Sequence, residues 1–519
     1  MPESALLKVN RLTVSFGENP VVRGVDFSLH HGEILAIVGE SGSGKSVTCS
    51  AIAGLLPSGG CITHGECTHV PSGTSWAACE TAANAPLGQG LSLVFQDPMS
   101  SLNPSMRIGW QVAESALVHH QCSKDEARTV ATDLLREVEL SEPEKAFEKY
   151  PHEMSGGQKQ RVMIALALAA EPEVLIADEP TTALDATVQK SILALLKKVQ
   201  GQRQMGVIFI THDLDVVHAV ADRVLVMQHG RIVESGEVNT VLEQPAHPYT
   251  QALLRARDID RFQQSDPSGS PLVQAVNTAK WYSDFCAVHD VSLAIDRGER
   301  VGLIGESGSG KSTLGRMLIG MLPATSGTIT FDGETVDPAN RSSMARLRRR
   351  AQLVFQDPYS ALNPKLTVGS ALEEVLTQAG VKAKEATNRA HRLLEEVGLE
   401  SGDSEKYPSG FSGGQRQRIV IARALAMEPE FVVLDESVAA LDVQIQRDVL
   451  ELLDHIGRER KLTYLFISHD LDVVASFCNR LVILEKGRIV EAGETDEIRQ
   501  NPATEYTVEL LGSRPKNLR

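Results

Sequence analysis

The octapeptide GESGSGKS occurs twice, at Gly39–Ser46 and again at Gly305–Ser312. Each copy has the pattern G-x-x-x-x-G-K-S and follows a short apolar run, Ile34–Val38 in the first case and Val301–Ile304 in the second. A short apolar run of this kind is typical of a buried parallel strand, and the glycines allow a sharp turn into a helix. The repeated octapeptide therefore predicts an α/β fold with a phosphate-binding loop, present in two copies.

Four further blocks recur in the same order, which chance cannot explain. They are LVFQDP at Leu93–Pro98 and Leu353–Pro358, SGGQ at Ser155–Gln158 and Ser412–Gln415, Asp-Glu at 178–179 and 435–436, and His-Asp at 212–213 and 469–470. The chain is therefore a duplication, with predicted domains at 1–257 and 280–519 and a polar Ser/Pro/Gly-containing linker at 258–279. The first copy carries extra residues. Part of this excess, Ser58–Gly90, is rich in small residues and predicts a loop or irregular edge structure.

Composition narrows the functional class. The chain has 519 residues and a formal net charge of -16, which argues against nucleic-acid binding because phosphate backbones select for basic surfaces. No stretch reaches the roughly 18 apolar residues of a membrane span, and the N-terminus does not resemble a signal peptide, so we expect any membrane role to act through a partner. The seven cysteines predict no disulfide framework, and the spacing of Cys61, Cys67 and Cys79 matches no zinc pattern.

The two octapeptides predict nucleotide and Mg²⁺ ligands. Backbone amides of the glycine-rich turn would surround the β- and γ-phosphates, with help from the dipole of the following helix. Lys45 and Lys311 would neutralise phosphate oxygens, and Ser46 and Ser312 would ligate Mg²⁺.

The Asp-Glu pairs follow four-residue apolar runs in both halves. Asp178 and Asp435 suit an outer Mg²⁺ ligand, whereas Glu179 and Glu436 can polarise an attacking water. An isolated Asp-Glu pair is more often two solvated surface acids. Its place after a buried strand in both copies favours the catalytic interpretation.

Two more polar positions also follow apolar strands. Gln96 and Gln356 can contact Mg²⁺ or the lytic water, and can transmit loop closure to a partner. His212 and His469 can donate to a γ-phosphate, although a lone histidine would more often be structural. The repetition in register favours a catalytic role.

The SGGQ blocks precede apolar helical patterns. A serine hydroxyl, glycine amides and a helix N-terminus make an anion site. Since each phosphate loop already holds its own nucleotide, we expect each SGGQ block to reach a γ-phosphate across an interface.

These motifs, in this order, resemble an ATP-binding-cassette (ABC) ATPase over nearly the whole chain. The resemblance implies two tandem P-loop NTPase cassettes, each with a mostly parallel core sheet, an antiparallel β subdomain and a helical subdomain, paired head to tail around two ATP molecules. Asp185 and Asp442 match the D-loop of the family. The implied first site comprises Gly39, Ser41, Gly42, Gly44, Lys45, Ser46, Gln96, Asp178, Glu179 and His212, with Ser412, Gly413, Gly414 and Gln415 in trans. The implied second site comprises Gly305, Ser307, Gly308, Gly310, Lys311, Ser312, Gln356, Asp435, Glu436 and His469, with Ser155, Gly156, Gly157 and Gln158 in trans.

In this family an aromatic residue at a fixed distance before the phosphate loop stacks on adenine. Phe16 and Tyr282 stand at that distance, although Trp281 and Phe285 compete with Tyr282, and core packing is the alternative for all of them.

Finer features resemble the peptide/nickel importer ATPases. They are QDPMSSLNP (Gln96–Pro104), QDPYSALNP (Gln356–Pro364) and HPYTQALL (His247–Leu254). Fused pairs of this size resemble the microcin C and glutathione importer ATPases. This implies a motor subunit bound peripherally at the cytoplasmic face of the membrane. Its partners would be two permease subunits and, indirectly, an extracytoplasmic substrate-binding protein, and its solute a short peptide. The second copy departs from the pattern, with Ser437 for the usual Pro and with NPATEYTVELL in place of HPYT.

A soluble tandem-cassette translation factor acting on the ribosome is the alternative. Such factors resemble this chain in having two cassettes, but they carry a long, charged helical linker, whereas the join here is short and contains Ser and Pro. A DNA-repair ATPase would need zinc modules or coiled coils, which the sequence lacks.

Overall fold

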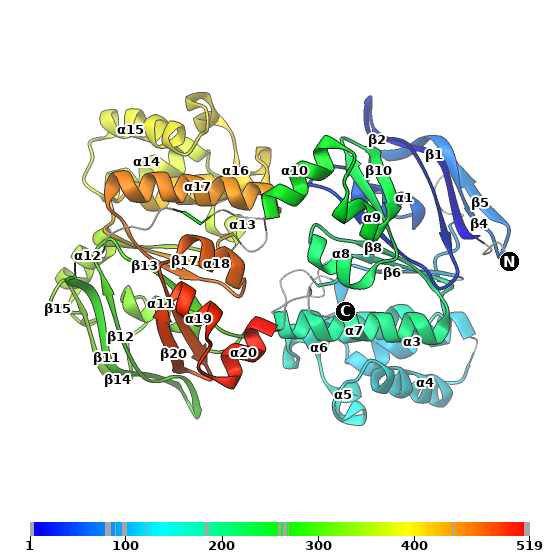
Figure 1. Ribbon diagram of the computed structural model, residues 1–519, viewed down its shortest axis with the longest axis horizontal. Coiled ribbons are helices and arrows are strands. Elements are labelled where there is room, and N and C mark those ends of the chain that lie inside the picture. The colour runs from blue at the N-terminus through cyan, green and yellow to red at the C-terminus, as the bar shows by residue number, and fades with distance from the viewer. Residues whose placement is uncertain are drawn as a thin grey trace. The chain divides into compact units, whose positions relative to one another are not determined.

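The computed structural model describes residues 5–77, 85–88, 90–95, 101–120, 122–181, 186–257, 261–262, 267, 269–355, 357–438 and 441–512. The chain divides into two compact units, the first within Met1–Arg257 and the second within Asp258–Ser513. Each unit is described by itself, and Figure 1 labels the elements of both.

The first unit contains two sheets with helices between and beside their strands. Its strands are β1 (Ala5–Phe16), β2 (Asn19–His30), β3 (Ile34–Val38), β4 (Gly60–His69), β5 (Thr74–Ala77), β6 (Leu91–Val94), β7 (Val174–Asp178), β8 (Gly206–Ile210), β9 (Arg223–Gln228) and β10 (Arg231–Glu237). Its helices are α1 (Lys45–Ile52), α3 (Ile108–His120), α4 (Lys124–Glu137), α5 (Pro143–Glu148), the 3₁₀ turn η2 (Pro151–Glu153), α6 (Gly156–Leu168), α7 (Ala186–Arg203), α8 (Leu214–Val220), α9 (Val238–Glu243) and α10 (Pro248–Arg257).

The second unit repeats this order of elements. Its strands are β11 (Pro271–Tyr282), β12 (Phe285–Asp296), β13 (Arg300–Ile304), β14 (Ser326–Phe331), β15 (Glu334–Thr335), β16 (Ala351–Val354), β17 (Phe431–Asp435), β18 (Thr463–Ile467), β19 (Arg480–Glu485) and β20 (Arg488–Glu494). Its helices are α11 (Lys311–Leu318), α12 (Arg341–Arg350), α13 (Pro358–Ala361), α14 (Val368–Gln378), α15 (Ala383–Glu396), η3 (Ser401–Glu405), η4 (Pro408–Gly410), α16 (Gly413–Leu425), α17 (Val443–Arg460), α18 (Leu471–Phe477), α19 (Thr495–Gln500) and α20 (Glu505–Gly512).

Both units have the same two sheets. The core sheet of the first unit has the order β10-β9-β3-β8-β7-β6, parallel except for the β9–β10 hairpin, and the second unit has β20-β19-β13-β18-β17-β16. A smaller antiparallel sheet has the order β2-β1-β4-β5 in the first unit and β12-β11-β14-β15 in the second. In the first unit the antiparallel sheet and the helices α3–α5 lie on different sides of the core strands (Figure 1). This confirms the predicted fold: two cassettes, each with a mostly parallel core, an antiparallel β part and a helical part.

The parallel arrangement brings the carboxyl ends of the motif-bearing strands to one edge of each core sheet. Strand β3 pairs with β8, and β8 pairs with β7, in the first unit. In the second unit β13 pairs with β18, and β18 pairs with β17. The phosphate loop, the Asp-Glu pair and the histidine therefore start from adjacent strand ends, as expected for an α/β site.

Two sequence expectations differ from the structure. Ser58–Gly90, expected to be a loop or irregular edge structure, contains the edge strand β5 and also β4, which lies inside the antiparallel sheet between β1 and β5. These strands bury Cys67, His69 and Trp76, whose indole N–H donates to the carbonyl of Ala51, and this alternation is hidden by the abundance of small residues. The second part of the predicted linker 258–279 is also a strand, since β11 begins at Pro271. The domain boundaries themselves stay a prediction.

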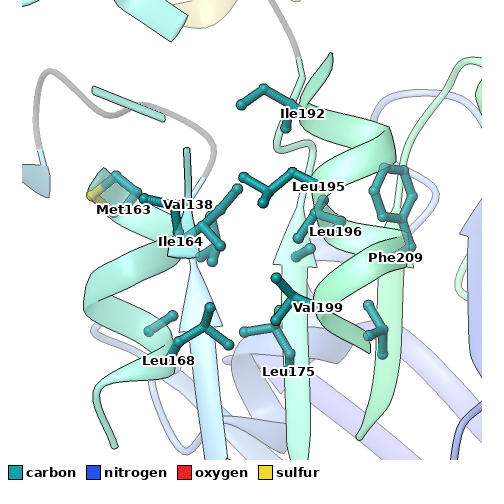
Figure 2. Close-up of a cluster of buried hydrophobic side chains, with 14 of the residues drawn as sticks. Val138, Met163, Ile164, Leu168, Leu175, Ile192, Leu195, Leu196, Val199 and Phe209 are labelled. Carbon is teal, nitrogen blue, oxygen red and sulfur yellow. The ribbon is translucent and has the colours of Figure 1, made fainter. Parts of the chain in front are cut away.

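The core that holds the SGGQ helix against the sheet consists of aliphatic side chains. Figure 2 shows α6 contributing Met163, Ile164 and Leu168 and α7 contributing Ile192, Leu195, Leu196 and Val199, packed near Leu175 of β7 and Phe209 of β8. All are buried. Burial of such a side chain contributes about 1.5–3 kcal/mol, so this cluster ties the second half of α6 firmly to β8 and to β7, which ends at the acidic pair.

Candidate nucleotide-binding sites

The first glycine of each phosphate loop is required because a neighbouring backbone carbonyl approaches it too closely for a side chain. Gly39 has φ +150, and a Cβ there would lie 2.2 Å from the carbonyl oxygen of Met227. Gly44, with φ 103, immediately precedes α1. The second loop repeats this, since a Cβ at Gly305 would lie 2.1 Å from the carbonyl oxygen of Leu484. The tight turn predicted from the octapeptide is thus the turn observed between strand and helix.

The loop lysines point back into their own loops. Lys45 is buried, and its Nζ donates to the carbonyl oxygens of Gly39 at 2.7 Å and Glu40 at 2.9 Å. Lys311 is buried in the same way, and its Nζ lies 2.8 Å from the Gly305 carbonyl oxygen. Each ammonium group is therefore fixed within the glycine-rich turn, where it can meet an anion.

The serine that follows each lysine lies next to the aspartate of the Asp-Glu pair. The Ser46 hydroxyl donates to Asp178 Oδ1 at 3.3 Å, and the Ser312 hydroxyl donates to Asp435 Oδ1 at 2.7 Å. Burial, together with the Glu179 charge, raises the pKa of Asp178 to about 6. Hydroxyl and carboxylate oxygens are the donors that Mg²⁺ prefers, and a desolvated carboxylate gains most from a nearby cation. The residues therefore fit a Mg²⁺ ion at both positions.

In the second site an arginine side chain lies beside the aspartate. The guanidinium of Arg316 lies 3.8 Å from Asp435 Oδ2, and the corresponding position after the first phosphate loop is Ser50. Burial raises the pKa of Asp435 as well, but the hydrogen bond from Ser312 and the charge of Arg316 oppose the rise. Arg316 lies outside the repeated motifs, so no local sequence pattern indicates its contact with Asp435 of β17.

The glutamates that follow these aspartates have an unusual backbone. Glu179 has φ 45 and Glu436 has φ 47, in the left-handed region that non-glycine residues rarely occupy. The backbone N–H of Glu179 donates to the carbonyl of Ile210 at 3.0 Å, and that of Glu436 donates to Ile467 at 2.9 Å. Such a conformation costs on the order of 1 kcal/mol or more. The hydrogen bond to the neighbouring strand stabilises this backbone conformation. The conformation in turn directs each glutamate carboxylate away from the strand direction.

Each glutamate meets the histidine of its own unit. His212 Nδ1 lies 3.3 Å from Glu179 Oε1, and His469 Nδ1 lies 3.7 Å from Glu436 Oε1. The hydrogen bond with His469 lowers the pKa of Glu436. Burial would lower the pKa of His469, but the hydrogen bond and charge of Glu436 raise it overall. Both pairs join a base to an imidazole at the edge of the sheet.

The aspartate after each histidine explains the recurring His-Asp pair. Asp213 is the N-cap of α8 and accepts the backbone N–H groups of Asp215 and Val216. Asp470 caps α18 in the same way. The cap fixes where the helix begins and thereby fixes the preceding histidine.

The SGGQ serines and glutamines form capping boxes. Ser155 caps α6 by accepting the N–H of Gln158 at 3.3 Å, while Gln158 Oε1 accepts the N–H of Ser155. Ser412 and Gln415 do the same at α16. The serine hydroxyl proton remains able to donate, so capping does not prevent anion binding.

The glycines of SGGQ have two different environments. A Cβ at Gly157 would lie 2.5 Å from Val188, and one at Gly414 would lie 2.3 Å from Ile445, so these glycines allow α6 and α16 to pack closely. A Cβ at Gly413 would meet nothing within 4 Å. Its face is therefore open to an incoming group.

The two aromatic candidates occupy equivalent register positions. Phe16 ends β1 and pairs with Asn19, and Tyr282 ends β11 and pairs with Phe285. Phe16 is half-buried against Gly60, whereas Tyr282, Trp281 and Phe285 are exposed. Both remain candidates for adenine stacking.

Some predicted residues lie outside the described part of the chain. They are Gln96, Gln356 and Asp185, together with Cys79 of the cysteine group. Within the described residues, no group of three or more His, Cys, Asp and Glu side chains is arranged to hold a metal ion, and no helix is long and apolar enough to cross a membrane.

One connection to the phosphate loops had no expected role. The backbone N–H of Glu40 donates to the hydroxyl of Tyr249 at 3.0 Å, and that of Glu306 donates to the hydroxyl of Tyr506 at 3.0 Å. Tyr249 belongs to the HPYT segment noted in the sequence. Tyr506 belongs to NPATEYTVELL, which lacks HPYT but keeps the tyrosine, and this shared tyrosine is the sequence signal that could have indicated the contact.

Comparison with known proteins gives a consistent result over the whole chain. The family model described as ABC transporter matches residues 22–182 and 288–439, and the model described as Oligopeptide/dipeptide transporter, C-terminal region, matches residues 233–290. The chain is 43% identical over 532 residues to the peptidoglycan transport ATP-binding protein YejF of Agrobacterium fabrum, covering 98% of this chain and 96% of that protein. It is 41% identical over 557 residues to the glutathione import ATP-binding protein GsiA of Escherichia coli K12, covering 98% and 89%. The corresponding GsiA of Pectobacterium atrosepticum is 40% identical over 562 residues, covering 99% and 90%.

Proposed function

This chain belongs to the ABC transporter family, and we propose that it is the ATP-hydrolysing motor subunit of an importer for short peptides or related solutes. Its relatives are named as ATP-binding proteins of peptidoglycan transport and glutathione import. A match to the oligopeptide/dipeptide transporter C-terminal region supports the same solute class. The alternative, a translation factor acting on the ribosome, is not favoured, because these full-length relatives are transport proteins.

The observation that carries this proposal is the repeated constellation at one edge of each core sheet. In both units a buried lysine, a serine–aspartate contact and a glutamate–histidine pair lie on adjacent strand ends. A site used only to bind nucleotide would need the loop and the lysine. The strained glutamate beside a histidine adds a base, which supports hydrolysis.

The roles of the residues follow from their chemistry. Lys45 and Lys311 leave their loop carbonyls and neutralise the β- and γ-phosphates of ATP. Glu179 and Glu436 orient and polarise the water that attacks the γ-phosphorus, and the histidines steady the transferred phosphoryl group by hydrogen bonding. Ser46, Ser312, Asp178 and Asp435 would hold Mg²⁺, which spreads the negative charge of the phosphates. Gln96 and Gln356 complete the proposed set.

Two further assignments rest on the resemblance to the family. Each SGGQ helix serves the nucleotide bound by the other half, and Phe16 and Tyr282 stack on adenine. The free donor capacity of the capping serines and the open face at Gly413 support the first assignment. Two permease subunits at the cytoplasmic face of the membrane would receive the motion, and an extracytoplasmic binding protein would deliver the solute.

Substitution of both glutamates tests the enzymatic part. Glu179→Gln with Glu436→Gln should retain ATP binding and lose at least about 100-fold in turnover, as for removal of a general base. The matched control is Glu171→Gln with Glu428→Gln. These exposed glutamates also have positive φ, 49 and 53, but lie outside the sites. Wild-type turnover in the first variant, or equal losses in both, would contradict the assignment.

Transport is tested separately in cells. A strain lacking this chain should fail to accumulate radiolabelled di- and tripeptides, and the wild-type chain should restore uptake while the double glutamine variant does not. Affinity purification from detergent-solubilised membranes should recover two permease subunits. Co-sedimentation with ribosomes, without permeases, would instead support the translation factor.

A further inference from the structure

Each unit sends one tyrosine from its last helix to the backbone of its own phosphate loop. Tyr249 in α10 and Tyr506 in α20 accept the backbone N–H of Glu40 and Glu306, both at 3.0 Å. Tyr249 is only 8% exposed. The contact joins residues 209 positions apart in the first unit and 200 in the second. Since the contact occurs in both units, it is a shared feature of the fold and not a peculiarity of one loop.

The tyrosine bonds the same peptide group that holds the loop lysine. In the peptide between Gly39 and Glu40, the N–H donates to Tyr249 and the carbonyl oxygen accepts Lys45 Nζ at 2.7 Å. The peptide between Gly305 and Glu306 is bonded in the same way by Tyr506 and Lys311, the latter at 2.8 Å. Two hydrogen bonds at opposite ends of one peptide fix its plane and polarise each other.

In the first unit the carboxylate of Glu234 in β10 fixes the start of α10 and thereby the position of Tyr249. Glu234 accepts the backbone N–H groups of Ala246 at 2.8 Å and His247 at 3.1 Å. The ring nitrogen Nδ1 of His247 accepts the N–H of Tyr249 at 3.2 Å. The first turn of the helix is therefore anchored to β10, and the side chain of Tyr249 is directed from an ordered start.

The second unit reaches the same geometry with an equivalent glutamate but a different cap. Glu491 accepts the N–H of Ala503 at 2.9 Å and of Thr504 at 3.3 Å, and the hydroxyl of Thr504 accepts the N–H of Thr507 at 3.1 Å. Threonine thus replaces histidine as the cap, and the proline that follows the histidine is replaced by glutamate. The two units retain the glutamate anchor on the preceding strand and the tyrosine hydroxyl on the loop peptide.

We propose that Tyr249 and Tyr506 are positioning residues that hold each phosphate loop ready for ATP before ATP arrives. This proposal rests on the proposed ATPase function. The hydroxyl accepts the N–H of the peptide whose carbonyl binds the lysine, so the loop does not have to order itself at the moment of binding. The last helix of each unit thereby sets the affinity of its own nucleotide site.

Removal of the hydroxyl should act on affinity and leave the chemical step unchanged. Phenylalanine keeps the ring in its packing and leaves the peptide N–H without this partner. The peptide can then rotate, so the fraction of loops that are competent to bind falls, and the apparent dissociation constant rises in proportion. Loss of one buried hydrogen bond predicts a rise of roughly three- to tenfold in KM for ATP. The group that attacks phosphorus is untouched, so kcat should change by less than about twofold.

The test compares two variants of the full chain. One carries both Tyr249→Phe and Tyr506→Phe, and the other carries Tyr464→Phe. Tyr464 is a matched control because it is fully buried and its hydroxyl donates to the carbonyl of Leu453 at 3.0 Å, within a packed core and not at a phosphate loop. Four quantities are measured for each variant: KM for ATP, kcat, the thermal unfolding midpoint without nucleotide, and the ATP dissociation constant. The last is measured by equilibrium dialysis in the Glu179→Gln and Glu436→Gln background.

We expect the two variants to differ in ATP affinity but not in the direction of their stability change. Both should unfold at a lower temperature than wild type, whereas only the Tyr249 and Tyr506 variant should show the raised KM and dissociation constant. If that variant loses thermal stability as Tyr464→Phe does and keeps the wild-type KM, the tyrosines are merely structural and the proposal is overturned. A wild-type chain that neither binds nor hydrolyses ATP would overturn the proposed function as well, which distinguishes the two failures.

Discussion

Replacement of Asp178 by asparagine should stabilise the first unit while removing a proposed Mg²⁺ ligand. The ordinary pKa of an aspartate is 3.8, and burial first, then the charge of Glu179, raises that of Asp178 to about 6. At about 1.4 kcal/mol per pH unit, this difference makes the ionised Asp178 cost on the order of 3 kcal/mol in the unliganded protein. Asparagine carries no charge and still offers an oxygen to Ser46, so the variant should recover most of this free energy.

The gain should depend on pH in a defined direction. The folded state binds the proton of Asp178 more tightly than the unfolded state, so ionisation destabilises the fold only above the pKa of the unfolded chain. The free energy of unfolding gained by Asp178→Asn should therefore be near zero at about pH 4, increase between about pH 4 and 6, and remain constant above about pH 7.

Tryptophan fluorescence can follow the first unit alone. Trp76 and Trp110 belong to the first unit, and the remaining tryptophan, Trp281, lies in β11 of the second and is 45% exposed. In a Trp281→Phe background, urea unfolding at several pH values reports the first unit without interference. Addition of Mg²⁺ with ADP should then stabilise the wild-type first unit more than the variant, because a ligand that binds only the folded state raises its stability.

The corresponding aspartate of the second unit provides the comparison. Asp435→Asn should stabilise its unit less, because Arg316 at 3.8 Å already offsets part of the cost of the charge. An Asp178→Asn variant that is no more stable than wild type at about pH 7.5, or a gain that is the same at pH 4 and pH 7, would refute the reasoning from burial.

Three other substitutions test separate parts of the structure. Gly39→Ala should abolish nucleotide binding at the first loop, measured by dialysis, because its Cβ would lie 2.2 Å from a backbone oxygen that cannot move aside. Arg300→Met should cost less than the roughly 3–5 kcal/mol of a wholly unpaired buried charge, because Asp454 loses Arg300 at 2.8 Å but keeps its ion pair with the half-exposed Arg458, and Arg300→Met with Asp454→Leu should cost less again. His469→Ala should cost on the order of 1 kcal/mol near pH 6 and less near pH 8 in urea titrations. The reason is that Glu436 raises the pKa of His469 and the pair attracts only while the histidine is protonated; a cost that grows toward pH 8 would contradict this.

Much of the fold could be predicted because parallel strands are encoded locally. Each core strand that carries a motif contains a run of four or five apolar residues, as in Ile34–Val38 and in the part of β17 that precedes Asp435, and such runs need no distant information. A repeated order of motifs then fixed the duplication. The comparisons confirm the family, and the structure brings the lysine, the acidic pair and the histidine of each unit together as expected.

The failures came from segments where local composition misleads. Ser58–Gly90 contains β4 and β5 because Cys67 and Trp76 find apolar neighbours in the first unit, although small residues surround them in the sequence. The predicted linker overlaps β11 because alternate residues such as Val273 and Ala275 pair with both β12 and β14. Strand formation here depends on the partner strand, which a local pattern does not contain.

The sequence by itself determined the duplication, the type of fold and the residues that end each core strand, because glycine geometry and apolar runs act over a few neighbouring positions. Only the tertiary structure decided which distant groups meet those strand ends. The hydroxyl of Tyr249 on the Glu40 amide and the guanidinium of Arg316 beside Asp435 join elements far apart in the chain. Their meeting depends on strand order and on how each helix packs, and these are set by the folded core as a whole.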